Sequence, residues 1–481
     1  MRLVPATNSQ KLSGPRLHYK AFVGARPARW ERRLKPGPES LPKATSEPEG
    51  AAFAAIDWAD QKNFWRWTAA GSQQQEQGEL ENTPEAVAVW AAALPQRFGG
   101  RPIAVCWEQS RGAWVYMLAQ YAHLVLFPVH PTTAARYGQA FCTSGAKADP
   151  RHTASLLDLL LRHGERLRPL QPDTVETRLL QFLVEERRRT VEERTRQSNR
   201  LTDCWKLYFP QILHWFDDGT GPVVGDLLDR WPDWKQLQRA HPGTLRKFFH
   251  EHNCRGAERI PERIDALYQA IPATQDAAVR EAGAMTAGGL VRLLATLRSP
   301  IVVLEKRIQE LVHSHPDGAL FSSLPGAGAA LVPRWIVAFG TRRDRYPSAY
   351  QLPCYSGIAP VQEASGKTER IHFRFTCPKF LRQTLHEFAL HSMRHSGWAK
   401  ACYEHLRNDQ KKSHHAAVRA LAYKWIRIIY RCWKDGKPYD EERYLKSLHR
   451  RGSLFAGALG LATGAGWKTV AGFQKFSGEN A

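Results

Sequence analysis

The chain lacks a long uninterrupted apolar run, a closely spaced cysteine pair and enough acidic residues to balance its basic ones. A membrane-spanning helix needs about 20 predominantly apolar residues, so we expect no transmembrane segment. The N-terminus has scattered basic residues without the apolar core of a secretory signal. Eight cysteines occur without any CxxC pair, which argues against a zinc ribbon or a disulfide scaffold and favours a reducing cytoplasm.

The basic surplus is large and unevenly distributed. The 481 residues include 68 Lys and Arg against 46 Asp and Glu, a formal net charge of +22. This predicts a polyanionic partner, with nucleic acid first because released counterions supply binding free energy, and an anionic membrane surface second. Residues 367–451 hold 20 Lys or Arg against eight acidic residues. We therefore expect many of the phosphate contacts to come from this region.

The N-terminal third is predicted to open with an arm and continue as an α/β domain. Residues 1–50 contain seven prolines and ten Lys or Arg, which predicts a basic, largely extended segment. From residue 51, apolar runs ending at Asp57 and Glu108 and a run over 124–129 predict strands, and residues 64–68 predict a return strand. Helices are predicted over 84–94, 112–121 and 149–163. Strands that alternate with helices indicate a central sheet in a domain spanning 51–168.

The middle of the chain, residues 169–318, is predicted to be a helical linker. Residues 177–202 form a charge-dense helix, and a second long helix has leucines and isoleucines at alternating steps of four and three from Leu290 to Leu311. Pro300 is expected to kink it. Such a seam favours an antiparallel helix pair that also dimerises, although a core within one chain competes with that interpretation. The helical stretch over 204–271 has no assigned role.

Residues 319–451 are predicted to form a mainly helical domain, followed by a tail over 452–481. Apolar residues repeat at helical spacing over 380–388 and 418–429, with basic residues between them. These positions predict core faces of two helices whose other faces are basic.

Three acidic residues stand at the ends of predicted elements. Asp57 and Glu108 each end a strand, and Asp149 opens a helix. Carboxylates at neighbouring strand ends meet at one sheet edge, where they can hold two divalent cations about 4 Å apart. Oxygen ligands suit Mg²⁺ or Mn²⁺. Each also has a structural interpretation: a turn cap for Asp57, an ion pair with Arg111 for Glu108, and a helix N-cap for Asp149.

A fourth ligand is expected one helical turn after Asp149. His152 follows by three residues, about 300° around the helix, which places it on the same face. Asp158 follows by nine residues, about 900°, which places it on the opposite face. The angles therefore favour His152, although Asp158 is the harder ligand for a hard cation.

Two glycine-containing segments are candidates for contacts with phosphate. Gly326 and Gly328, between two predicted helices, fit the hairpin of a helix-hairpin-helix, in which backbone amides face a DNA phosphate. A helix C-cap is the structural alternative. Ser365 lies in Ser-Gly-Lys-Thr and could be a nucleophile or, as the local sequence favours, a turn residue.

Together these motifs resemble the insertion-sequence 110/116/902 family of transposases, the Piv-like DEDD recombinases. The acidic motifs are Ile56-Asp57, Trp107-Glu108 and Lys147-Ala-Asp149. The C-terminal motifs are Leu324-Pro-Gly-Ala-Gly, Tyr355-Ser-Gly-Ile-Ala-Pro, Ser365-Gly-Lys and Lys379-Phe-Leu-Arg382. The resemblance covers roughly residues 51–440, and its C-terminal part is the more specific.

The resemblance implies an α/β RuvC-like (RNase H-type) domain, a helical coiled-coil segment and a mainly α transposase domain. It implies Mg²⁺ or Mn²⁺ at Asp57, Glu108 and Asp149, with His152 where the family has a fourth acidic residue. It further implies Ser365 as a nucleophile that links covalently to DNA, and basic contacts to nucleic acid in the same C-terminal domain, for which the candidates are Lys367, Arg370, Lys379 and Arg382.

The implied partners are donor and target DNA, a structured guide called a bridge RNA, and further copies of the chain in a dimer or tetramer, without a membrane. The implied location is the bacterial cytoplasm, associated with the nucleoid. Two other functions are compatible with the same residues. One is a RuvC-like junction nuclease that hydrolyses DNA with an activated water, and the other is a nucleic-acid-binding relative inactivated at His152.

Overall fold

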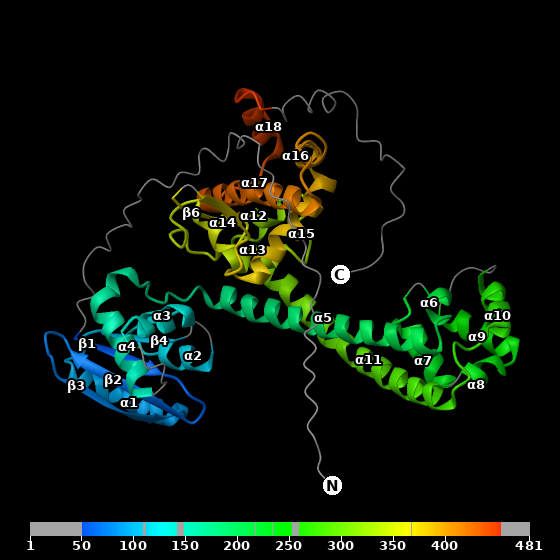
Figure 1. Ribbon diagram of the computed structural model, residues 1–481, viewed down its shortest axis with the longest axis horizontal. Coiled ribbons are helices and arrows are strands. Elements are labelled where there is room, and N and C mark those ends of the chain that lie inside the picture. Colours follow the sequence, from blue (N-terminus) through cyan, green and yellow to red (C-terminus); the bar gives the residue numbers. More distant parts are fainter. Residues whose placement is uncertain are drawn as a thin grey trace, which may run out of the picture. The chain divides into compact units, whose positions relative to one another are not determined.

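The computed structural model describes residues 51–108, 112–141, 149–216, 218–232, 234–252, 259–366 and 368–453. The chain divides between Gln171 and Pro172 into two compact units, which Figure 1 colours from blue to cyan and from teal to red. The arm expected before residue 51 and most of the expected tail lie outside the described residues.

The first unit is built on a five-stranded mixed sheet, in the order β3-β2-β1-β4-β5. The neighbours β1, β4 and β5 run parallel, whereas β1, β2 and β3 run antiparallel. The strands are β1 (Ala52–Asp57), β2 (Lys62–Ala69), β3 (Gln75–Glu81), β4 (Ile103–Glu108) and β5 (Leu124–Val129). The predicted α/β character of this part is confirmed.

Helices cover both faces of this sheet, and the alternation of side chains along the strands explains how. Ala54, Ile56 and Trp107 share one core with residues of α1 (Pro84–Arg97) and α2 (Ala113–Ala119). On the opposite face, the alternate strand positions pack with α3 (Pro131–Phe141) and α4 (Asp149–His163), which a short 3₁₀ turn (Gly164–Arg166) follows. Central strands buried on both faces account for their nearly continuous apolar sequences.

The second unit contains the expected antiparallel pair of long helices, α5 (Val175–Tyr208) and α11 (Ala277–Ser314). Three contacts show the antiparallel direction, because the residue numbers increase along α5 while they decrease along α11. Thr177 contacts His315 at 3.0 Å, and Arg187 contacts Glu305 at 2.9 Å. The Cys204 thiol contacts the Gly283 carbonyl at 3.4 Å. Figure 1 shows the two helices side by side. The pair forms within one chain, and Pro300 lies inside α11 without ending it. Dimerisation through this pair stays a prediction.

Helix α11 bears on the expectation that the chain has no transmembrane segment. In the described part of the chain, it is the helix long and apolar enough to cross a membrane by length and composition. Basic residues such as Arg292 and Arg298 interrupt any strictly apolar run, but the leucine, valine, isoleucine and alanine residues around them raise the mean hydropathy. Its buried stripe, which includes Leu294, Ile301 and Ile308, packs into the cores of the folded unit.

Each end of the helix pair belongs to its own hydrophobic core. At one end, Leu201 and Trp205 of α5 pack with short helices. These are α6 (Ile212–Trp215), α7 (Pro222–Arg230), α8 (Trp234–Gln238), α9 (Pro242–Glu251) and α10 (Arg259–Gln269). The previously unassigned stretch therefore folds into a helical cap on the pair.

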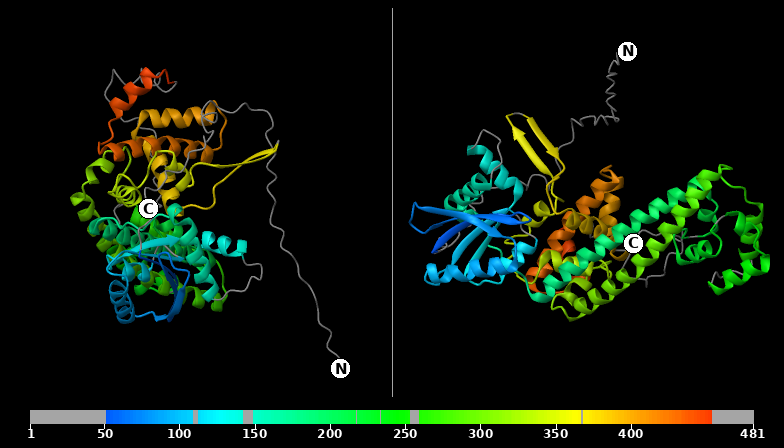
Figure 2. Two further views of the ribbon diagram at one scale, coloured as in Figure 1. Left: turned by 90° about the vertical axis from the view of Figure 1, so that its left-hand side faces the viewer. Right: turned by 90° about the horizontal axis from the view of Figure 1, so that it is seen from below.

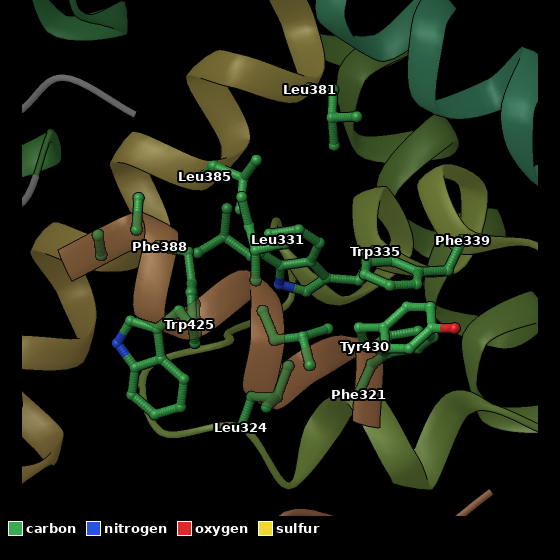
Figure 3. Close-up of a cluster of buried hydrophobic side chains, with 14 of the residues drawn as sticks. Phe321, Leu324, Leu331, Trp335, Phe339, Leu381, Leu385, Phe388, Trp425 and Tyr430 are labelled. Carbon is green, nitrogen blue, oxygen red and sulfur yellow. The ribbon is translucent and has the colours of Figure 1, made fainter. Parts of the chain in front are cut away.

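At the other end, Leu180 of α5 and Ile308 of α11 belong to the core of the C-terminal helices. Trp335 and Phe388 meet there edge to face with ring centroids 5.4 Å apart (Figure 3). The elements are α12 (Gly318–Ser322), α13 (Val332–Phe339), α14 (Gln351–Tyr355), β6 (Val361–Ser365), β7 (Thr368–His372), α15 (Lys379–His395), α16 (Gly397–Asn408), α17 (His414–Asp435) and α18 (Glu441–Arg450). The C-terminal part is helical apart from one hairpin.

The close approach of α5 and α11 predicts opposite effects for two glycine substitutions. A Cβ at Gly283 would overlap the buried ring of Tyr208, whereas one at Gly289 would meet no atom within 4 Å. We expect Gly283→Ala to destabilise the protein by about 1–3 kcal/mol through overpacking. The matched Gly289→Ala should stabilise it by up to about 1 kcal/mol because alanine favours the helix. Urea unfolding measures both, and equal effects would contradict the packing of this pair.

Candidate active site

Asp57 and Glu108 extend from the ends of neighbouring parallel strands toward the same face of the sheet. In the register between β1 and β4, Ala55 pairs with Cys106, and both pack against α4. Successive side chains alternate between faces, so the residues two positions later, Asp57 and Glu108, also face α4. Burial of the alternating strand residues thus brings the two carboxylates together.

His152 of α4 lies between these two carboxylates. Its Nδ1 is 3.0 Å from Asp57 Oδ2, and its Nε2 is 3.0 Å from Glu108 Oε2. All three side chains are partly exposed, between 22% and 33%. Asp158 points elsewhere: it accepts hydrogen bonds from the Tyr137 hydroxyl and from Arg162, both at 2.6 Å. Burial raises the pKa of Asp158, but the hydrogen bonds from Arg162 and Tyr137 outweigh it, and the pKa is lowered.

Asp149 is the first residue of α4, one turn before His152, and its side chain is exposed. Its backbone carbonyl accepts a hydrogen bond from the Thr153 hydroxyl at 3.0 Å. Among the described residues, no three acidic, imidazole or thiol groups already surround one point at metal-ligand distance. In this structure the imidazole of His152 lies between Asp57 Oδ2 and Glu108 Oε2. The donor set, two or three carboxylates with an imidazole, fits a divalent cation.

Three residues that the sequence analysis did not identify hold this arrangement in place. Arg66 of β2 donates to the Pro150 carbonyl at 3.2 Å, in the first turn of α4. The Cys106 thiol of β4 contacts the Leu156 carbonyl at 3.2 Å. Asn63 is fully buried and accepts from the Ala59 amide at 3.2 Å, which fixes the turn after Asp57. Nothing in their local sequence distinguishes them, because their partners are distant or are backbone atoms.

Ser365 is the last residue of β6, in the hairpin that β6 and β7 form. It is exposed and pairs with Thr368 across a two-residue connection, and Gly366 in that connection has a φ of +57°. The hairpin stands out from the helices of its own unit as a two-stranded ribbon (Figure 2). Ser365 is thus both a turn-flanking residue, as the local sequence suggests, and an accessible hydroxyl.

The register of the hairpin gives Ser365 polar neighbours on the same face. Glu363 lies two residues before it and pairs with Arg370, and the His372 Nε2 is 2.9 Å from Glu363 Oε1. The hydrogen bond to Glu363 raises the pKa of His372. One face of the ribbon therefore combines a hydroxyl, a carboxylate, a guanidinium and an imidazole.

Ser356, the other serine of these motifs, has the opposite environment. It is only 1% exposed, and its hydroxyl donates to the Pro353 carbonyl at 3.3 Å. A hydroxyl held in the core cannot reach a phosphodiester without local unfolding. Of the two serines, only Ser365 is accessible.

The two glycines of the candidate phosphate loop have different environments. Gly326 has a φ of +84°, and a Cβ there would lie 3.0 Å from the His391 carbonyl carbon of α15. Its conformation and close packing are enough to explain the glycine. Gly328 faces open space, with no atom within 4 Å of an added Cβ. Of the two, Gly328 has room for a phosphate beside it.

The four candidate basic contacts have different surroundings. Arg370 of β7 and Lys379 at the start of α15 are exposed. Arg382 is half-buried, with its guanidinium 4.5 Å from the centroid of the Phe373 ring. Lys367 lies outside the described residues.

Comparisons with known proteins match both units. A family model described as a transposase, of the DEDD type, matches residues 54–210, and the model of the transposase IS116/IS110/IS902 family matches residues 318–404. The mini-circle putative transposase for IS117 from Streptomyces coelicolor is 27% identical over 347 residues, 71% of this chain and 83% of the relative. The insertion element IS110 uncharacterized 43.6 kDa protein of the same organism is 25% identical, over 61% of this chain and 72% of that protein. The IS900 uncharacterized 42 kDa protein of Mycobacterium paratuberculosis is 24% identical, with 61% and 73% covered.

Proposed function

This chain belongs to the IS116/IS110/IS902 family of transposases, and from that membership we propose that it cuts and rejoins donor and target DNA by phosphodiester transfer at a metal-dependent carboxylate site. The observation that carries the proposal is the convergence of Asp57 and Glu108 on one face of the sheet, with both nitrogens of His152 between them. In a RuvC-like fold, such an edge is where phosphodiester chemistry takes place.

In the proposed site, Asp57, Glu108 and Asp149 hold the metal, with His152 as the fourth ligand. A bound Mg²⁺ or Mn²⁺ supplies a positive charge that polarises the phosphodiester and stabilises its transition state. The residues of the chain determine where that charge is placed: β1 and β4 fix two ligands, and α4 fixes the other two. Arg66 orients α4 through its contact with the Pro150 carbonyl.

We assign the nucleophile to Ser365. Its Oγ forms a bond to phosphorus while the bond from phosphorus to one sugar oxygen breaks, and the hydroxyl proton must leave for a base. Glu363, the carboxylate of β6 on the same face of the ribbon, is the candidate base. The guanidinium of Arg370 on that face would stabilise the added negative charge on the phosphate. The exposed position of Ser365 and the buried position of Ser356 favour this assignment.

The experiment that tests the proposed chemistry uses purified full-length protein, the RNA that copurifies with it and DNA from the flanks of its gene. We expect strand cleavage and joining that require Mg²⁺ or Mn²⁺ and stop when the ion is chelated. DNA binding without any cleavage in either ion would contradict the proposal and indicate a binding protein.

We also propose that the chain works with a structured guide RNA that pairs with both DNAs, and as a dimer or tetramer. The net charge of +22 supports the nucleic-acid partners, and the family resemblance is the basis for the guide. Sequencing the copurifying RNA tests this: one abundant structured species complementary to both DNAs is expected. A mixture of random cellular RNA would contradict it.

The proposed fourth ligand predicts the effect of two substitutions on α4. We expect His152→Asp to keep or raise cleavage in Mg²⁺, because a carboxylate is the harder ligand. Asp158→Ala should leave the cleavage rate unchanged and lower the free energy of unfolding by about 1 kcal/mol, since it loses its bonds to Tyr137 and Arg162. Cleavage that survives His152→Ala but not Asp158→Ala would reverse the assignment.

The charge distribution predicts how binding responds to salt. If residues 1–50 and 367–451 neutralise DNA phosphates, the logarithm of the affinity should fall linearly with that of salt, by about 0.9 per phosphate. Deleting residues 1–50 should make the slope shallower. Filter-binding titrations measure this, and affinity independent of salt would contradict the electrostatic account.

A further inference from the structure

Beside the root of the Ser365 hairpin, basic side chains from α15 and α17 surround one aromatic ring. The guanidinium groups of Arg382 and Arg419 each lie 4.5 Å from the centroid of Phe373, the residue directly after β7. His386 is one turn after Arg382 on α15, and His415 is one turn before Arg419 on α17. Two helices thus bring two guanidinium groups to the base of the hairpin.

In the described part of the chain, this cluster has no acidic partner. Among the described residues, Arg374, Arg382 and Arg419 have no carboxylate within 4 Å, although Arg382 donates to the Arg374 carbonyl at 3.1 Å. Glu387, on the same helix, is engaged with Arg334 and Gln383. The cluster therefore holds like charges together without an anion to stabilise them.

The same side chains contain buried donors without acceptors. The Nε atoms of Arg374 and Arg419 and the Nε2 atom of His386 are inaccessible to solvent and have no hydrogen-bond partner among the described residues. Burial, then Arg419 and Arg382, lower the pKa of His386 to about 4. Burial and Arg382 also lower the pKa of Arg419. Unbalanced charge is costly in a native fold, as are unsatisfied polar atoms, and the electrostatic cost falls when an anion binds beside the two guanidinium groups.

We propose that Arg382 and Arg419 bind one backbone phosphate of the DNA strand that Ser365 attacks. Guanidinium groups match the oxygens of a phosphate in a forked geometry, and Phe373 keeps the two groups in place. This inference rests on the proposed function, because it takes the attacked strand as the ligand. The cluster is a positioning site, since it lies away from the reacting atoms.

The hairpin sets the spacing between this phosphate and the one that reacts. Phe373 lies five residues beyond Thr368, the partner of Ser365, and five steps of an extended strand span about 17 Å. One strand of B-form DNA advances about 3.4 Å per phosphate along the axis. Because the phosphates also wind around that axis, a separation of about 17 Å is reached after about three nucleotides and at most about five, which places the bound phosphate about three to five nucleotides from the phosphodiester that Ser365 attacks.

The first test compares two substitutions that each remove one positive charge. Arg419→Gln should weaken DNA binding about tenfold and reduce the salt slope by about 1. Arg246→Gln is the matched control, because Arg246 is an exposed residue of α9 in the helical cap, and it should change the affinity less than twofold. Equal effects of the two substitutions would overturn the proposal.

The second test replaces single phosphates of the DNA with neutral methylphosphonates and uses wild-type protein, so it does not depend on how Arg419→Gln folds. One position about three to five nucleotides from the cleaved bond should weaken binding about tenfold. The same replacement should have a clearly smaller effect on Arg419→Gln, in which only Arg382 still contacts the phosphate, and its full effect on Arg246→Gln. The proposal would be overturned if no single replacement weakened binding, or if the replacement weakened binding to Arg419→Gln as much as to the wild type.

The dependence of the methylphosphonate effect on Arg419 is measured by DNA binding. The proposed phosphate site is therefore tested separately from the proposed cleavage chemistry. Two further results would assign the site to another ligand and overturn the proposal. One is a loss of affinity in Arg419→Gln for the copurifying RNA instead of the DNA. The other is displacement of DNA by millimolar inorganic phosphate beyond the effect of chloride at equal ionic strength. We expect neither.

Discussion

Replacing Asp57 with Ala is expected to lower the rate of DNA cleavage at least about 1,000-fold, and Glu108→Ala should do the same. Loss of one ligand removes several kcal/mol of stabilisation from the transition state, and each 1.36 kcal/mol corresponds to a factor of about ten. Nucleic-acid affinity should change little, because binding depends mainly on basic residues elsewhere. Gel assays of cleavage and filter binding on the same protein preparations measure both quantities.

The matched control for these variants is Asp60→Ala. Asp60 is an exposed acidic residue in the turn after β1, three positions beyond Asp57. It carries the same charge as Asp57 but lies outside the proposed metal site. We expect its cleavage rate to stay within twofold of wild type. Full activity in Asp57→Ala, or an equal loss in Asp60→Ala, would remove Asp57 from the proposed site.

Ser365→Ala is expected to abolish both the covalent protein–DNA intermediate and the recombinant products. The substitution removes the oxygen that we propose attacks phosphorus. The ribbon that carries Ser365 keeps its register, because the pairing of β6 and β7 uses backbone groups. Guide and DNA affinities should stay within twofold of wild type. Denaturing gels that retain protein-linked DNA measure the intermediate.

Ser356→Ala separates this effect from the general loss of a hydroxyl. The buried Ser356 hydroxyl donates to Pro353, so its removal should lower the free energy of unfolding by about 1 kcal/mol. The intermediate should still form. Recombination that persists in Ser365→Ala and disappears in a folded Ser356→Ala would exchange the two roles.

Part of the candidate site could be predicted from local sequence because it depends on regular periodicity. The strand pattern places Asp57 and Glu108 at strand ends, and the helical angle places His152 on the face of Asp149. The structure has His152 beside both carboxylates and Asp158 with Tyr137. The metal-binding role of His152 stays a prediction.

Other parts could not be predicted because their signals are weak or long-range. The edge strand β3 has almost no apolar residue, and the Ser365 hairpin is exposed on both faces, so neither shows the alternation that marks a half-buried strand. The cluster around Phe373 joins α15 to α17, residues more than 30 positions apart. Only the packing of these helices brings Arg382 and Arg419 together.

The most direct test of the central claim is to identify the chemical group that the cleaved DNA carries. Wild-type protein with its RNA, DNA and Mg²⁺ would be denatured during the reaction, digested with trypsin and analysed by mass spectrometry. The account predicts a peptide containing Ser365 with a nucleotide attached through its hydroxyl. DNA ends that carry only a free phosphate and a free hydroxyl, with no protein attached at any time, would contradict it and identify a nuclease that hydrolyses DNA with water.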